Sequence, residues 1–219
     1  MATRRPPPPP KTKTNPTGRA QTARGEVTRA KLLEVAHGLF IRNGFHGTSM
    51  RQIADAAGVA VGGIYNHFGD KEAIFAAVLD AYHPYHTLLP ALEATEGDTV
   101  EAYVHNITTR ARAEMTGIET RLLPLVFMEL VEFQGRHLKQ LAAKMFPALL
   151  NFMQGLTQRR GKLRPLPLPV MLRAYLGLMI GFLISEMLLK DSPVLKNADY
   201  DWYGGMVDIY LHGILEPEA

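Results

Sequence analysis

Polar side chains that can bind nucleic acid gather between Thr48 and Leu79, in the stretch TSMRQIADAAGVAVGGIYNHFGDKEAIFAAVL. Their hydroxyl, amide and imidazole groups can form hydrogen bonds with phosphates and with base edges. Asn66 is the candidate base reader, because its amide can pair with the edge of an adenine. The chemistry that this stretch indicates is DNA binding.

The sequence lacks the patterns of the common catalytic and metal sites. It has no Gly-x-Ser-x-Gly elbow and no phosphate-binding loop, and it has no cysteine for thiol catalysis, a disulfide or zinc. His83 and His86 are three residues apart, but Pro84 between them disfavours a helical metal pair. We therefore expect no catalytic residue, no metal and no cofactor.

The elements that position the polar side chains have the lengths of a helix-turn-helix, at about residues 49–68. Thr48 or Ser49 can cap a first short helix, and Gly58 ends it because a left-handed backbone costs glycine little. A second short helix, over about 61–68, would then enter the major groove. Apolar residues can pack the two helices together: Ile53, Ala54, Ala57, Val59, Ile64 and Phe68.

Helical periodicity extends along the rest of the chain, so the predicted fold class is all-α. Apolar residues at three- and four-residue spacings predict helices over about 26–43, 71–82, 99–116, 119–133, 136–160, 168–190 and 199–215. Breaks rich in glycine, proline and asparagine separate these helices, and no strict alternation predicts a strand. We expect a DNA-binding domain over 25–83 and a second helical domain over 84–219.

A basic, proline-rich arm precedes the first predicted helix. Residues 1–24 include five consecutive prolines and carry a charge of +6, whereas residues 26–219 sum to −3 and the whole chain to +3. This composition predicts a disordered arm. DNA phosphates would attract the arm, and a solubilising tail is the alternative interpretation.

Composition favours a soluble, cytoplasmic protein. Hydrophobic residues make up 47% of the 219 residues and charged residues 21%, and the N-terminus lacks the apolar stretch of a signal peptide. The apolar run over 166–189 is about as long as a membrane span. It carries Arg173 and Glu186, and each would cost about 2.5 to 3.5 kcal/mol at a bilayer centre. A buried or interface helix is therefore the favoured interpretation, with no membrane partner.

The N-terminal part resembles the DNA-binding domain of TetR-family regulators. The resemblance covers about residues 26–83, from TRAKLLEVAHGLFIRNGFHGTSM through AGVAVGGIYNHF to DKEAIFAAVL. A Gly-Phe turn, a Thr-Ser cap, Ile-Ala, Ala-Gly-Val, Tyr-x-His-Phe and Asp-Lys-Glu follow one another without gaps. The resemblance implies a homodimer that binds a palindromic operator through the major groove. It also implies a repressor, by family default, that releases DNA when a small ligand binds the C-terminal domain.

Carried over to this sequence, the resemblance implies these DNA-binding residues: Thr48, Ser49, Val61, Gly62, Gly63, Ile64, Tyr65, Asn66, His67 and Lys71. Gly62 would let the backbone approach DNA closely, and Tyr65, His67 and Lys71 would bind phosphates. Thr48 would place its cap and backbone amides at a phosphate. Phe68 is expected in the core.

Two positions depart from the family pattern. Ala60 stands where serine or threonine is usual, and Gly63 stands where serine, threonine or alanine is usual, so hydroxyl contacts are lost. Together with Val61, they leave the recognition helix weakly polar, and residues 26–83 sum to −1. We therefore expect the basic arm to contribute to DNA affinity.

The C-terminal domain shares no sensing motif with the family, so its apolar faces alone indicate sites. A pocket for a small hydrophobic effector, or plain core, is predicted at Tyr103, Ile107, Phe127, Met145, Phe146, Leu149 and Met153. Four polar residues would orient the ligand, or are surface or satisfied polar residues: His105, Arg110, Glu129 and His137. A homodimer interface on the last two helices is predicted at Ala174, Gly177, Gly181, Phe182, Trp202, Met206 and Tyr210.

A helical module that binds a protein partner is the alternative function, and an enzyme is a third class that no motif supports. A module would need the recognition helix to be buried. Substitution of Tyr65 and Lys71 discriminates between the two: a regulator loses DNA binding but stays folded, whereas a module loses stability.

Overall fold

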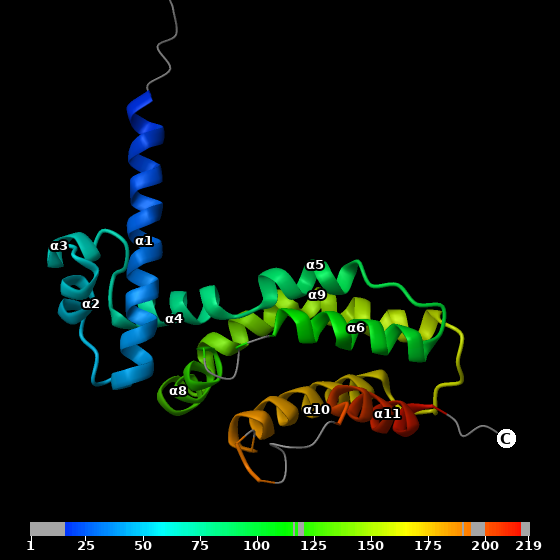
Figure 1. Cartoon of the computed structure of the whole chain (residues 1–219). Helices are drawn as coiled ribbons and strands as arrows, with labels where there is room; N and C mark the ends of the chain where they lie inside the picture. The colour runs from blue at the N-terminus through cyan, green and yellow to red at the C-terminus, as the bar shows by residue number, and fades with distance from the viewer. Residues whose placement is uncertain (1–15, 116, 118–120, 190, 194–199, 216–219) are drawn as a thin grey trace, which may run out of the picture.

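The computed structural model of the chain describes residues 16–115, 117, 121–189, 191–193 and 200–215. Helices build this part of the chain, which confirms the predicted all-α class (Figure 1). The first fifteen residues of the predicted arm lie outside the described residues, as do residues 118–120 near the start of the predicted helix 119–133.

The N-terminal group of helices contains α1 (Pro16–Asn43), α2 (Met50–Ala57), α3 (Val61–Ile64) and α4 (Lys71–Tyr82). Ser49 caps α2: its hydroxyl oxygen accepts from the Gln52 N–H, and the Gln52 side chain accepts from the Ser49 N–H. Gly58 has the predicted left-handed backbone, with φ at 66°. Asp70 caps α4 by accepting from the Ala73 N–H at 2.7 Å. The predicted boundaries of α2 and α4 are confirmed.

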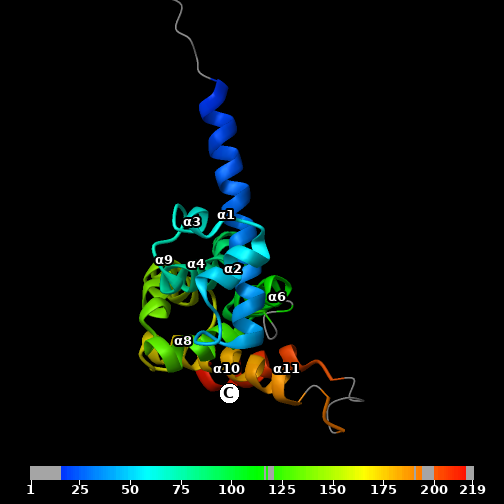
Figure 2. The same cartoon turned by 90° about the vertical axis from the view of Figure 1, so that its left-hand side faces the viewer.

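Helix α1 begins earlier than the sequence predicts. The expected start was residue 26, after a disordered arm that ends at 24, but the helix starts at Pro16. Proline is tolerated in the first turn of a helix, and the alanines and arginines that follow it are good helix formers. Once the packed turns of α1 exist, they extend at little cost. Figure 2 shows the start of α1 standing clear of the other helices.

Helix α3 is shorter than the sequence predicts. The prediction was a helix over 61–68, but the α-helix ends at Ile64 and turns continue the chain. The Phe68 N–H still bonds to the Ile64 carbonyl oxygen at 3.0 Å, so the segment stays compact. The helix is short because Ala60 offers no side-chain cap and a Gly-Gly pair follows Val61.

The C-terminal group contains α5 (Tyr85–Glu93), α6 (Val100–Glu114), α8 (Leu123–Phe133), α9 (Arg136–Gln158), α10 (Leu168–Leu189) and α11 (Trp202–Ile214). Helices α5, α6 and α9 form one layer, and α10 and α11 form a second layer below it in Figure 1. The sequence did not predict α5, because Pro84 precedes it and Pro90 lies within it. The other five helices lie within the predicted ranges.

One hydrophobic core crosses the domain boundary predicted between residues 83 and 84. It joins side chains of α1, α2 and α4 to side chains of α8 and α9. At its centre the Phe133 ring of α8 lies 4.8 Å from the Phe45 ring and 5.1 Å from the Phe75 ring, centroid to centroid. A second core lies between α6, α9, α10 and α11. The N-terminal group of helices therefore shares its interior with α8 and the first turns of α9.

Helix α10 is strongly apolar, and only part of its apolar surface lies in the two cores. Its length and its mean hydropathy of 1.8 would allow it to cross a membrane, and 22% of that window is buried inside the chain. The buried residues are Met171, Tyr175 and Leu183. The exposed large apolar side chains of α10 are Val170, Ile180, Leu188 and Leu189.

Candidate nucleic-acid interface

The recognition segment, residues 61–68, has one polar exposed side and one apolar buried side. Tyr65 is 53% exposed, and Asn66 is exposed beside it. Ile64 and Phe68 are buried in the first core, which confirms Phe68 as core. The assignment of Ile64 to DNA contact was wrong, because its side chain points between the helices to hold the segment in place.

Thr48 serves the fold rather than a phosphate. Its hydroxyl lies 2.9 Å from the Gly44 carbonyl oxygen and 3.2 Å from the Leu39 carbonyl oxygen. Its backbone N–H donates to the Phe45 carbonyl oxygen, and the side chain is buried. These contacts satisfy carbonyl groups at the end of α1, where a helix lacks internal partners. The predicted role of Thr48 at a phosphate is therefore corrected, whereas Ser49 stays exposed while it caps α2.

Lys71 closes the loop between α1 and α2. Its ammonium donates to the carbonyl oxygens of Phe45 and Thr48, each at 2.7 Å, and lies 4.3 Å from the centre of the Phe45 ring. An ammonium has three donors, so one of them remains for a phosphate. A substitution of Lys71 would therefore change the fold and DNA binding together, and Tyr65 is the cleaner probe.

The glycines of α3 differ in the space around them. A Cβ built on Gly62 would meet no atom within 4 Å, and Val61 beside it is exposed. A Cβ on Gly63 would lie 3.0 Å from Cγ1 of Val59. Gly62 thus leaves open surface at the start of the recognition segment, and Gly63 packs against the turn.

We expect Gly62→Ala to stabilise the chain but to weaken DNA binding. Alanine favours a helix over glycine by about 0.5 to 1 kcal/mol, and the new methyl group has room in the free protein. On DNA the same methyl would meet the phosphate backbone, so affinity should fall about tenfold, or about 1.4 kcal/mol. Urea unfolding and a DNA titration measure the two effects.

Gly63→Ala is the matched control for the stability effect. Crowding against Val59 should offset the gain in helix propensity, so this variant should stabilise the chain less than Gly62→Ala. Equal stabilisation by the two variants would show that the environment of α3 differs from the one described.

A family model matches the same segment. Residues 32–78 match the model described as "Bacterial regulatory proteins, tetR family". This N-terminal segment of the chain is therefore of the TetR type. The matched model describes regulatory proteins, which agrees with the expectation that this segment has no catalytic role.

Two known regulators are similar to part of this chain. The HTH-type transcriptional regulator TtgR of Pseudomonas putida is 32% identical over 106 residues, which are 48% of this chain and 44% of the relative. The HTH-type transcriptional repressor KstR2 of Rhodococcus jostii is 41% identical over 54 residues, which are 25% and 26% of the two chains. The chain thus spans less than half the length of these relatives.

Solved structures extend the TetR fold over most of the chain. NalD, the secondary repressor of the MexAB-OprM multidrug efflux pump in Pseudomonas aeruginosa, has a TM-score of 0.64 at 22% identity, over 88% of this chain and 99% of that one. SmeT of Stenotrophomonas maltophilia, in complex with triclosan, has a TM-score of 0.61 at 23% identity, over 87% and 92%. At this identity the likeness shows the fold alone.

The structure does not bring the predicted ligand-pocket residues into one cavity. Phe127 and Phe146 are 41% and 58% exposed, so their placement in a pocket was wrong. The others are divided: Tyr103, Ile107 and Met153 lie at the second core, Met145 lies at the first, and Leu149 is half-buried. The buried face of α9 passes through Leu141, Ala148 and Phe152, which turns position 146 outward.

A cavity of about 440 Å³ lies elsewhere, between the end of α6, α10 and the start of α11. The Arg112 guanidinium lies 4.5 Å from the centre of the Tyr203 ring, and the Phe182 ring lies 4.3 Å from the same ring. Glu186 and Trp202 also line the cavity. Its volume is in the range of small-molecule sites. The sequence missed it because its walls come from helices that are far apart along the chain.

The predicted dimer residues fall into one surface with one exception. A groove on α10 and α11 is lined by Gly177, Gly181, Phe182, Trp202 and Met206, and Ala174 is exposed on the same helix. Within the described part of the chain, a Cβ on Gly177 or Gly181 would meet no atom within 4 Å. The exception is Tyr210, whose assignment was wrong: it is buried and its hydroxyl donates to the Met171 carbonyl oxygen at 3.1 Å.

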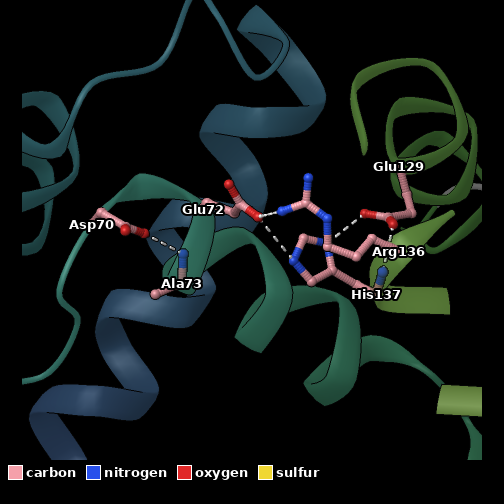
Figure 3. A network of polar contacts seen from close by, with 6 residues as sticks. All are labelled: Asp70, Glu72, Ala73, Glu129, Arg136 and His137. Atoms are coloured by element: carbon pink, nitrogen blue, oxygen red, sulfur yellow. Dashed lines mark hydrogen bonds and ion pairs between the residues drawn. The ribbon is translucent and has the colours of Figure 1, made fainter. Parts of the chain in front are cut away.

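The polar residues considered for a ligand have partners within the fold. Glu129 and His137 bond to each other, as Figure 3 shows. His105 lies 3.6 Å from a carboxylate oxygen of Asp208. These contacts confirm the alternative that such residues are satisfied within the fold.

Asp80 ties α4 to α9. Its Oδ1 lies 2.5 Å from the Lys144 ammonium and 3.0 Å from the Tyr85 hydroxyl. Burial alone would raise the pKa of Asp80, but the hydrogen bonds from Lys144 and Tyr85 outweigh it and hold the pKa below its ordinary value. The far end of α4 is thus fixed to the second region by an ionised carboxylate.

Proposed function

We propose that the chain is a sequence-specific transcriptional regulator of bacterial genes that acts in the cytoplasm. As a repressor, it would bind a palindromic operator as a homodimer and release it when a small hydrophobic ligand binds. The single observation that carries DNA binding is the exposed pair Tyr65 and Asn66 on the helix-turn-helix of a TetR-family chain. A protein-binding module would bury this surface, so its exposure favours the regulator.

The uncovered surface of α10 and α11 supports the homodimer. A second copy could pack its own α10 and α11 into the groove beside Gly177 and Gly181, where no side chain of this chain intrudes. Two recognition segments about 34 to 36 Å apart would then enter successive major grooves. The same pairing would cover the apolar helix that otherwise has the properties of a membrane span.

The cavity beside this groove supports ligand control. Phe182 and Trp202 line both the cavity and the groove, so a ligand in the first would change the packing of the second. SmeT, a protein of the same fold, has been solved in complex with triclosan. A ligand that favours the non-DNA state by a few kcal/mol would release the operator.

Selection of bound duplexes from a random DNA library tests the function. The purified protein is incubated with the library at about 0.15 M salt, where nonspecific binding is weak. Enrichment of a two-fold symmetric sequence is the expected result and would establish a dimeric operator binder. A folded protein that enriches no sequence would overturn the proposal in favour of the interaction module.

We expect Tyr65→Ala to abolish most operator affinity without loss of stability. A hydrogen bond to a charged phosphate contributes about 1.5 to 3 kcal/mol, and the exposed ring contributes little to the core. Titration with the enriched duplex and thermal unfolding measure the two quantities. Phe146→Ala, which removes a similarly exposed ring from α9, should change neither. A drop in the unfolding temperature for Tyr65→Ala alone would favour the module.

The fluorescence of Trp202 can report a bound ligand directly, because Trp202 is the single tryptophan of the chain. We expect triclosan to change the Trp202 emission, and we expect Phe182→Ala to weaken that binding about tenfold through lost apolar contact. Phe127→Ala should leave the titration unchanged, because Phe127 lies outside the cavity. An equal loss with Phe127→Ala would place the ligand at the pocket predicted from the sequence.

A further inference from the structure

A chain of polar contacts runs from α8 through α9 to the first turn of α4 (Figure 3). The carboxylate of Glu129, which is fully buried on α8, accepts from the His137 N–H and from the His137 Nδ1, each at 2.7 Å. On the other side of the ring, Nε2 of His137 lies 3.5 Å from Oε1 of Glu72. Arg136 donates to the same Glu72 oxygen at 2.6 Å.

The His137 ring is therefore placed between two carboxylates. A carboxylate accepts but does not donate, so Nδ1 carries the proton that faces Glu129. A second proton on Nε2 gives an imidazolium that attracts Glu72, whereas a neutral ring turns a lone pair towards it. In the described part of the chain, the other groups against the ring are Phe75 from α4 and Phe133 from α8, and neither titrates. Arg136 holds the Glu72 carboxylate whether or not the ring is charged.

The contact between His137 and Glu72 matters because of where Glu72 lies in the chain. It lies in the first turn of α4, directly after the Asp70 cap and the recognition segment 61–68. The His46 ring makes a second polar contact across the same boundary, at 2.6 Å from Glu132. Only two residues separate the recognition segment from the start of α4, so Glu72 lies close to the segment along the chain.

We propose that His137 is a positioning residue for operator binding. As an imidazolium between Glu129 and Glu72, it holds the first turn of α4 against α8 and α9. When the pH rises and the ring loses its Nε2 proton, this hold weakens, the recognition segment samples more orientations, and operator affinity falls. A test by operator affinity rests on the proposed function, but a test by the orientation of the recognition segment does not.

Distances between two spin labels test the orientation without DNA. The chain has no cysteine, so Ala56→Cys on α2 and Ala102→Cys on α6 introduce two exposed labelling sites, and dilution with unlabelled protein removes distances between copies. We expect one narrow distance distribution at about pH 5.5 that broadens at about pH 8.5. Glu72→Gln, at a partly exposed position that tolerates an isosteric change, should give the broad distribution at both pH values.

Two further variants separate His137 from the other histidines. His137→Gln should also be independent of pH, and His105→Gln, which breaks a histidine–carboxylate pair inside the C-terminal region, should behave as the unchanged protein. A distribution that does not respond to pH in the unchanged protein would overturn the proposal. So would a Glu72→Gln distribution that matches the unchanged protein.

Operator affinity gives the second readout. Between about pH 5.5 and 8.5, the affinity of the unchanged protein should fall about fivefold more than that of His137→Gln or Glu72→Gln, which is the upper range for a partly exposed ion pair. Equal falls in all three proteins would contradict the positioning role. A protein that binds no operator would refute the proposed function, while the spin-label distances would still decide the role of His137.

Discussion

Glu129→Ala should lower the free energy of unfolding by about 3 to 5 kcal/mol, the usual cost of removing one partner from a buried ion pair. The carboxylate is fully buried, and it accepts both from the backbone N–H and from the ring of His137. Without it, those two donors lose their partner in an apolar environment. Urea unfolding followed by circular dichroism measures the loss.

Glu132→Ala is the matched control, one turn away on the same helix. Glu132 also pairs with a histidine, but the His46 side chain in that pair is 78% exposed. An exposed ion pair contributes about 0 to 1 kcal/mol, so this variant should unfold close to the unchanged protein. If the two variants lost comparable free energies of unfolding, the burial of Glu129 would not add to the cost of its removal.

Phe133→Ala should cost about 3 to 5 kcal/mol, because it removes a buried ring from the interface between the two regions. The ring contacts Phe45 and Phe75 of the DNA-binding region and the His137 ring of α9. The cavity left behind would separate α8 from α4. Thermal and urea unfolding both report the change.

Phe127→Ala on the same helix provides the comparison for Phe133→Ala. Its ring is 41% exposed and lies outside both cores, so we expect a loss below about 1 kcal/mol. If Phe127→Ala destabilised the chain as much as Phe133→Ala, the shared core would not be the main contact between the regions.

The helices and the recognition surface could be predicted from the sequence because local signals specify them. Ser49, Gly58 and Asp70 act within a few residues of their own positions, and the structure confirms each of them. The end of α3 could not be placed, because the missing cap at Ala60 and the weak helix propensity of two glycines compete with a strong family pattern. Where local preferences conflict, tertiary packing decides.

The functions of single polar residues depended on contacts that sequence spacing does not reveal. Lys71 and Thr48 resemble phosphate contacts, yet the Thr48 hydroxyl and two of the three Lys71 donors bond to carbonyl groups at the end of α1 and in the loop that follows. Tyr210 has the spacing of an exposed helix face, yet it packs in the second core. The cavity walls and the Glu72–His137 contact join segments more than sixty residues apart, so no local pattern predicts them.

The core shared across residues 83 and 84 limits how regulators of this kind can be recombined. A chimera that fuses residues 16–83 to an unrelated sensor would lose the ring of Phe133 and the buried side chain of Leu125, and it would leave Phe75 facing solvent. A chimera that also carries residues 121–141 would keep this interior and the Glu129–His137 pair. The exchangeable unit in this protein is therefore discontinuous, because the N-terminal helices keep their interior only together with α8 and the start of α9.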